Sequence, residues 1–344
     1  MVAQSAGPGG RGRRQRRPSA ASACRRRLHT TCAESIGDAT LTLGLSLPLL
    51  YAKLVSAEFC DALRWSERVI DLAEGDPSKG NFVIGSPLAL AFATRALTRY
   101  FLGCDGWQDD LRHAVTMAHS ADPMTYATVV GYVYMLGIPY GVLTPDDRAL
   151  REIEDALHDA ERSGDDFAFA VTRLTLGCAL VHRQTAAERD RGQKLMAEVS
   201  EAFVRERHNL SELPFVEVYL ARESARRGDR DGAIQRTRAA VDQLIYEGRL
   251  LSWGLPATAV LVETLLDRGT DGDWAEAEVA IERLAAAPTD DRLVMREIWL
   301  LRMHALSARA HGDEASYRDY RDRYRAMATS LGFEGHMQWA EALP

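Results

Sequence analysis

Apolar residues recur every three or four positions through most of the sequence after residue 36, which is the spacing of one face of an α-helix. One such stripe between residues 230 and 245 consists of Ala233, Ile234, Thr237, Ala240, Val241 and Leu244. A second stripe, built from smaller side chains, consists of Ala275, Ala277, Ala280, Ile281 and Leu284. The chain has no run of four to eight residues that alternates apolar and polar positions between turn signals, as a half-buried strand would. The pattern predicts an all-α protein.

Residues that favour helix ends separate these stripes. Capping signals occur at Ser86-Pro87, at Thr144-Pro145 and at Thr185–Glu188, the last with the spacing of a capping box. The first precedes an apolar run over residues 88–102, which we expect to end at Gly103. A Gly-Asp pair recurs at five further places, namely Gly75-Asp76, Gly164-Asp165, Gly228-Asp229, Gly272-Asp273 and Gly312-Asp313. We expect the glycine to end one helix in the left-handed conformation and the aspartate to cap the next.

These signals divide the chain into units of about forty residues, each with two helices. The second helices are predicted to begin near Glu58, Gly106, Pro145, Ala186, Arg230, Trp274 and Glu314. This period predicts an α-solenoid of about seven helix pairs over residues 36–344. The small-residue stripes resemble those of tetratricopeptide (TPR) repeats, but the period is longer and no unit meets the full consensus, so we describe the fold as TPR-like. Because units of such an array contact only their neighbours, we expect an elongated particle.

The charge of the chain is divided unevenly. The net charge is −7, yet residues 1–33 hold eight arginines and no acidic residue, so the rest of the chain carries −15. We expect residues 1–35 to form a disordered arginine-rich tail. The acidic body will repel phosphate backbones, so contact with nucleic acid is expected through the 1–33 tail or not at all.

Cysteine usage and hydropathy favour a cytoplasmic protein. The five cysteines are widely spaced and contain no CxxC pair, which argues against a disulfide framework or a zinc site; they are Cys24, Cys32, Cys60, Cys104 and Cys178. The most apolar stretch, residues 41–55, contains Pro48 and Lys53 and is too short to span a bilayer. We therefore expect no membrane contact.

The sequence lacks the patterns that carry common enzyme chemistry. It has no phosphate-binding GxxxxGK[ST] loop, no HExxH and no GxSxG, and its nine histidines are scattered. Paired acids could be mistaken for catalytic carboxylates, but each pair falls at a predicted helix start, where the helix dipole favours negative charge; the pairs are Asp109-Asp110, Asp146-Asp147, Asp165-Asp166 and Asp290-Asp291. We expect no catalytic, cofactor-binding or metal-ligating residue and no cofactor, so the chain is predicted not to be an enzyme.

The aromatic residues suggest where a ligand could bind. Five tryptophans lie at helix starts or on apolar stripes and are predicted to belong to the core; they are Trp65, Trp107, Trp253, Trp274 and Trp299. The least regular predicted helix is rich in tyrosine and in helix-breaking residues, namely Tyr126, Gly131, Tyr132, Tyr134, Gly137, Pro139, Tyr140 and Gly141. If the concave face holds a ligand groove, we expect it at this helix.

Residues 36–344 also resemble a known class of protein. The similar stretches are Leu63–Ala73, Gly85–Ala89, Gly106–Leu111, Leu174–Arg183, Val262–Gly269 and Ala328–His336. They resemble the C-terminal helical region of bacterial signalling proteins that carry a class III adenylate or guanylate cyclase domain, or a LuxR-type DNA-binding domain, with an AAA/STAND-type ATPase. The catalytic motifs of that class have no counterpart here, so the resemblance implies a regulatory role and no catalytic residue.

Two function classes follow. The first is a non-catalytic sensor scaffold that binds a protein or small effector on its concave face, with cyclase or ATPase domains in trans among its partners. The second is a transcriptional-regulator type of protein whose basic tail contacts nucleic acid. A gene fragment without retained function is a third alternative.

Overall fold

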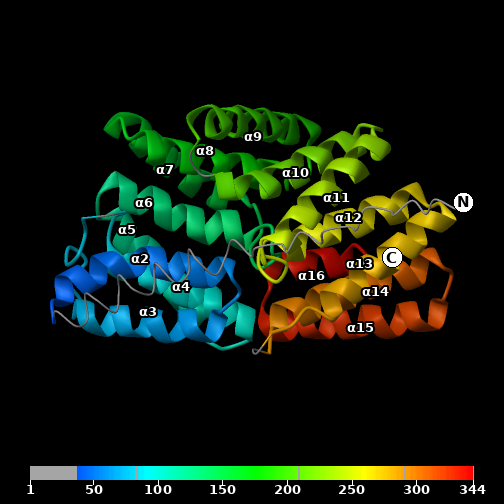
Figure 1. The fold of residues 1–344 in the computed structure, drawn as a ribbon, viewed down its shortest axis with the longest axis horizontal. Helices are drawn as coiled ribbons and strands as arrows, with labels where there is room; N and C mark the ends of the chain where they lie inside the picture. The colour runs from blue at the N-terminus through cyan, green and yellow to red at the C-terminus, as the bar shows by residue number, and fades with distance from the viewer. Residues whose placement is uncertain (1–36, 83, 208–209, 290–291, 344) are drawn as a thin grey trace, which may run out of the picture.

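The computed structural model describes residues 37–82, 84–207, 210–289 and 292–343, and these ranges contain helices and no strand. Within these described ranges the helices form seven consecutive pairs followed by one last helix, and Figure 1 shows their arrangement. The pairs are α2 (Ala39–Val55) with α3 (Phe59–Ala73), α4 (Pro87–Leu102) with α5 (Trp107–His119), α6 (Pro123–Val130) with α7 (Asp147–Ser163), α8 (Asp166–Leu180) with α9 (Ala186–Glu206), α10 (Leu213–Arg226) with α11 (Arg230–Tyr246), α12 (Gly254–Arg268) with α13 (Asp271–Ala285), and α14 (Val294–Ala310) with α15 (Glu314–Leu331). The last helix is α16 (Glu334–Glu341). The prediction of an all-α array of about seven TPR-like helix pairs is confirmed.

The predicted repeat boundaries agree with the structure. Each second helix begins within three residues of its expected start. The stripe predicted between residues 230 and 245 is the buried face of α11. In α13 the prediction is only partly right, because Ala275 is exposed and the buried Asp273 takes part in the packed face instead.

Most predicted helix caps are correct. Side chains of Ser86, Asp165, Thr185, Asp229 and Asp313 accept hydrogen bonds from backbone N–H groups at the starts of α4, α8, α9, α11 and α15. Gly103 ends α4 in the left-handed conformation, with φ of 75°.

Three capping predictions were wrong in detail. The N-cap of α7 is Asp146 and not Thr144, and Asp146 accepts a hydrogen bond from the backbone of Ala149 at 2.7 Å. In α13 the cap is Thr270, and Asp273 lies inside the first turn, where it completes a capping box. Asp76 accepts from Ser78 in a loop and caps no helix. At α7 and α13 the sequence offers several capping residues within four positions, whereas the helix after Asp76 begins only at Pro87 and is capped by Ser86.

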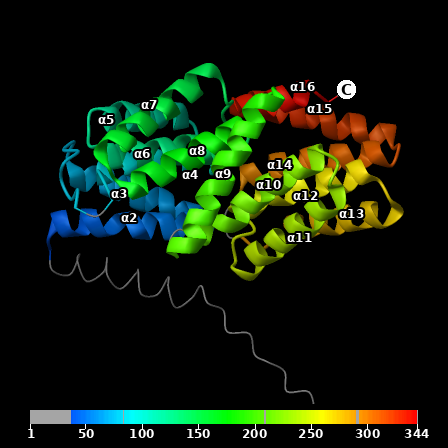
Figure 2. The ribbon, with the colours of Figure 1, turned by 90° about the horizontal axis from the view of Figure 1, so that it is seen from above.

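The first helices of successive pairs form the inner side of the array. Helix α2 packs on α4, α4 on α6, α6 on α8, α10 on α12, and α12 on α14. The second helices pack mainly on the first helices and lie on the outer side. In Figures 1 and 2, α8–α10 connect the N-terminal half of the chain to the C-terminal half.

The array closes on itself, so the expectation that each unit contacts only its neighbours was wrong. Helix α14 packs on α4, and the start of α16 meets residues 141–142 in the N-terminal half. The backbone N–H groups of Glu334 and His336 donate to the carbonyls of Val142 and Gly141 at 3.0 and 2.8 Å. A Cβ atom on Gly335 would come within 2.8 Å of the Gly141 backbone, so this approach requires glycine.

Aromatic packing at the closure is dense. Phe333, at the corner between α15 and α16, is fully buried and its ring contacts the rings of Tyr100 and Trp107. Trp107, Trp253 and Trp299 are buried as predicted, and Trp65 and Trp274 are half-buried. The closure thus builds one continuous core from residues more than two hundred positions apart.

Two further predictions concern the arginine-rich N-terminal segment and contact with a membrane. The arginine-rich segment 1–35 lies outside the described residues. Among the described helices, none combines the length and the apolar character that a membrane crossing requires.

Candidate functional site

The irregular helix expected around residues 126–141 is present. Helix α6 runs directly into a π-helical turn, η1 (Gly131–Met135), after which residues 136–146 form the connection to α7. A π-turn inserts an extra residue and shifts the direction of the side chains that follow, and such turns are frequent at functional sites. Here Tyr132 and Tyr134, two positions apart, line two different cavities on opposite sides of the turn.

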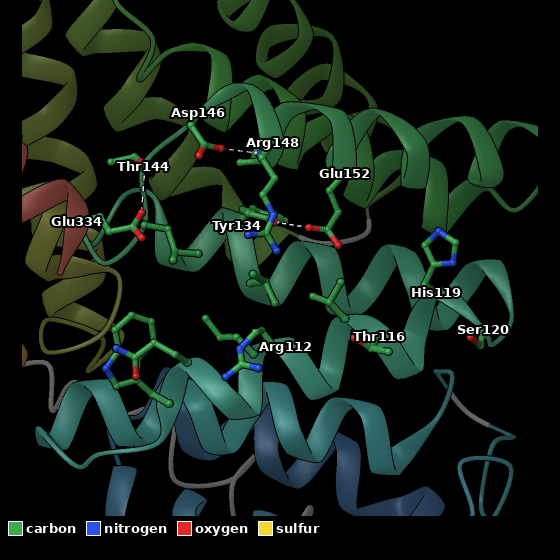
Figure 3. A pocket seen from close by; sticks show the side chains of 17 residues that line it. Arg112, Thr116, His119, Ser120, Tyr134, Thr144, Asp146, Arg148, Glu152 and Glu334 are labelled. Atoms are coloured by element: carbon green, nitrogen blue, oxygen red, sulfur yellow. Dashed lines mark hydrogen bonds between the residues drawn. The ribbon is translucent and has the colours of Figure 1, made fainter. Parts of the chain in front are cut away.

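The first cavity, which we call the outer groove, lies between α5 and α7 and has a volume of about 690 Å³. Tyr134 lies in its floor and donates a hydrogen bond to the Glu152 carboxylate of α7. Figure 3 shows Arg112 from α5 and Arg148 from α7 pointing into the groove from opposite sides. Glu334 closes one end and accepts a hydrogen bond from Thr144 at 3.2 Å. Because the groove separates two second helices, it lies on the outer side of the array and not on the concave face.

The second cavity, which we call the apolar cavity, lies on the concave side and has a volume of about 260 Å³. The first helices of four successive pairs contribute to its wall. The apolar lining consists of Leu47, Pro48, Leu50, Ile84, Leu90, Met135, Phe167, Val171, Leu174 and Phe203. Gly131 and Tyr132 of the π-turn complete the wall, so the predicted irregular helix does contribute to a concave-face cavity.

A buried carboxyl group forms the polar end of the apolar cavity. Glu212 is 8% exposed, and its Oε1 accepts a hydrogen bond of 2.5 Å from the Tyr51 hydroxyl of α2. Its Oε2 atom is buried and has no hydrogen-bond partner among the described residues. Burial raises the pKa of Glu212 above its ordinary value, although the Tyr51 hydrogen bond and the charge of Arg249 act in the opposite direction.

Arg249 adds unpaired donors behind this carboxyl group. Its Nη1 donates to the Ser211 carbonyl at 2.7 Å, whereas its buried Nε and Nη2 have no partner in the described part of the chain. The cavity wall is mainly apolar, and one carboxyl oxygen of Glu212 lacks a hydrogen-bond partner among the described residues. Such a cavity favours a small apolar molecule that carries a hydrogen-bond donor for this oxygen.

The other residues of the predicted site have structural roles. Tyr140 is buried, and its ring packs against Phe101 with centroids 5.1 Å apart. Tyr126 is buried and donates to the Glu152 carbonyl at 3.4 Å. The sequence did not indicate Tyr51 or Glu212, because only the packing of α2 against the start of α10 brings these distant residues together.

The acidic pairs lie mainly at helix starts. Of the pairs, those at 109, 146 and 165 begin helices as expected, and the pair at 290 lies outside the described residues. Asp110 is in addition buried, and Arg95 and Arg99 donate to it at 2.7–2.9 Å. In the described ranges no three His, Cys, Asp or Glu residues are grouped as metal ligands.

Comparison with known proteins adds little. No family model matches the sequence, and no curated protein is significantly similar to it. Among solved structures, the crystal structure of yeast Tom70 is similar, with a TM-score of 0.42 and 17% sequence identity, and the match covers 88% of this chain and 63% of Tom70. This likeness is weak, and the description of the fold as TPR-like rests on the helix pairs themselves.

Proposed function

We propose that this chain is a non-catalytic regulatory scaffold that binds a small, mainly apolar effector in the apolar cavity. The observation that supports this most is that one cavity collects side chains from the first helices of four successive pairs and ends in an orphaned carboxyl oxygen. A ligand in this position contacts α2, α4, α8 and the π-turn at once. It can therefore change how the pairs pack on one another, which is the property that a sensor needs.

The regulated partner is a protein, in keeping with a helix-pair scaffold. The resemblance of residues 36–344 to the helical region of cyclase and AAA/STAND signalling proteins supports a cyclase or ATPase domain as that partner. The outer groove, with charged side chains of both signs at its rim, is the surface we assign to it.

The effector site is tested with N-phenyl-1-naphthylamine, a neutral probe that fluoresces in apolar surroundings. Val171 lines the apolar cavity and Val115 lines the outer groove, and both are half-buried. We expect Val171→Trp to fill the apolar cavity and to weaken probe binding at least about tenfold, because the probe loses most of its apolar contact.

The matched variant Val115→Trp should leave probe binding unchanged, and circular dichroism shows whether both variants keep their helices. Equal affinity of the probe for the parent chain and for Val171→Trp, or loss only in Val115→Trp, would contradict the proposed site.

A further inference from the structure

A third cavity, of about 560 Å³, lies on the inner side of the second half of the array. Its walls come from α9, α10, α12, α14 and α16, together with the connections before α7 and between α8 and α9. It shares no lining residue with the apolar cavity. We call it the arginine cavity, after its lining residues Arg183, Arg189, Arg222, Arg226 and Arg302.

Positive charge exceeds negative charge in this cavity. Arg183 is neutralised by Asp147 and Glu188, but the other four arginines face only two carboxylates. Glu223 is shared by Arg189, Arg222 and Arg226, and Arg302 pairs with Glu263. Burial, and after it the charge of Arg222, lowers the pKa of Arg226, as expected where cations crowd together with too few anions.

The cavity also presents hydrogen-bond donors that nothing satisfies. The Nε atoms of Arg222 and Arg302 and the Nε1 atom of Trp299 are buried and have no hydrogen-bond partner among the described residues; the Glu223 carboxylate lies 3.9 Å from Arg222 Nε, beyond hydrogen-bond distance. Trp299 is 3% exposed, so the bulk solvent does not reach its indole N–H freely. All three groups are donors. Buried polar groups in folded proteins are nearly always hydrogen-bonded. A ligand with acceptor oxygens would provide the missing partners for these three donors.

The remaining walls are apolar and aromatic. Trp299, Trp339 and Tyr219 line the cavity, with Pro256, Ala259 and Val260 on α12. The guanidinium of Arg302 lies 5.7 Å from the Trp299 ring and 5.3 Å from the Trp339 ring, and that of Arg222 lies 4.6 Å from the Tyr219 ring. These rings hold the arginines in fixed directions, and the volume is in the range of cavities that bind organic ligands.

We propose that the arginine cavity binds a small organic phosphate, with a nucleoside diphosphate as the representative type. Phosphate oxygens accept charge-assisted hydrogen bonds from guanidinium N–H groups, and they supply both the negative charge and the acceptors that this cavity lacks. The organic group then contacts the aromatic and α12 walls. This site is separate from the effector site proposed above, and each proposal can fail without the other.

The first test is calorimetric titration of the full chain with ADP. We expect one binding site, and we expect Arg222→Gln and Arg302→Gln each to weaken ADP binding at least about tenfold, since each removes a charge-assisted donor. Arg238→Gln is the matched control, because Arg238 forms an ion pair with Glu276 on α11 and α13, outside the cavity. It should bind ADP as the parent chain does, and so should Val171→Trp.

Trp299→Phe keeps the aromatic packing and removes only the unpaired donor, so it tests the site if the arginine variants do not fold. It should weaken ADP binding severalfold while circular dichroism stays unchanged. Pyrophosphate should bind more weakly than ADP, and adenosine should not bind. The proposal would be overturned if ADP did not bind, or if adenosine bound as tightly as ADP. It would also be overturned if Trp299→Phe bound ADP with unchanged affinity. The same holds if an acidic peptide displaced ADP equally from the parent chain and from the cavity variants.

Discussion

At the scale of single residues, Glu212 is the group with the clearest consequence for stability. It is buried beside apolar side chains, and burial raises its pKa. Below its ordinary pKa of about 4.5, the carboxyl group is protonated in both the folded and the unfolded chain. As the pH rises, the unfolded chain loses the proton first, so the contribution of Glu212 to the free energy of unfolding decreases until the folded-state pKa is passed.

We therefore expect Glu212→Gln, which cannot titrate, to become more stable relative to the parent chain as the pH rises from 4 to 8. Denaturant unfolding of both chains at several pH values measures this difference. A difference that stays constant, or one that shrinks with rising pH, would show that Glu212 is not held in the environment described.

Local signals explain which residues could be predicted from the sequence. Caps such as Ser86 and Thr185 depend on neighbours within three positions, and the sequence identifies them correctly. Glu212 and Tyr51 are 161 positions apart and meet only through the packing of α2, so no spacing could reveal them. Arg222 continues the spacing of Phe215 and Tyr219 along α10. An arginine on an otherwise apolar helix face is unusual, and this position could have indicated the arginine cavity from the sequence.

At the scale of helices, the π-turn η1 determines where the side chains that follow α6 point. Gly131 begins this turn and packs closely against α8, since a Cβ atom there would lie 2.9 Å from Val171 Cγ1. We expect Gly131→Ala to lower the free energy of unfolding by about 1–3 kcal/mol, because the added methyl group forces α6 and α8 apart.

Gly272 provides the comparison, since it lies in the first turn of α13 and a Cβ atom there meets only Thr270 at 3.9 Å. Gly272→Ala should be neutral or stabilising by about 0.5 kcal/mol, because alanine favours the helix. Thermal unfolding of the two variants checks both values. Equal effects would mean that the contact between α6 and α8 is looser than described.

At the scale of the whole molecule, closure is what the sequence did not predict. The repeat period fixes the number of pairs, because it follows from signals inside each unit. Whether the array stays open depends on small rotations between successive pairs and on a few contacts between its ends, which leave no periodic trace. Phe333, Gly335 and His336 make these contacts, and they lie inside a stretch that the sequence marked only as part of a resemblance.

Closure also affects function, because it brings α2 to Glu212 and α16 to the arginine cavity. Both proposed ligand sites therefore depend on the contact between the ends. Removing that contact should open the array and weaken binding at both sites together, while each helix pair keeps its own stripe of buried residues.

The most direct test is small-angle X-ray scattering of the parent chain and of Phe333→Asp, which places a charge in the fully buried position between Tyr100 and Trp107. A compact protein of this length has a radius of gyration of about 20 Å. We predict a compact profile for the parent chain and a clearly larger radius of gyration for Phe333→Asp, with helical circular dichroism retained. An elongated profile for the parent chain, equal to that of the variant, would contradict closure.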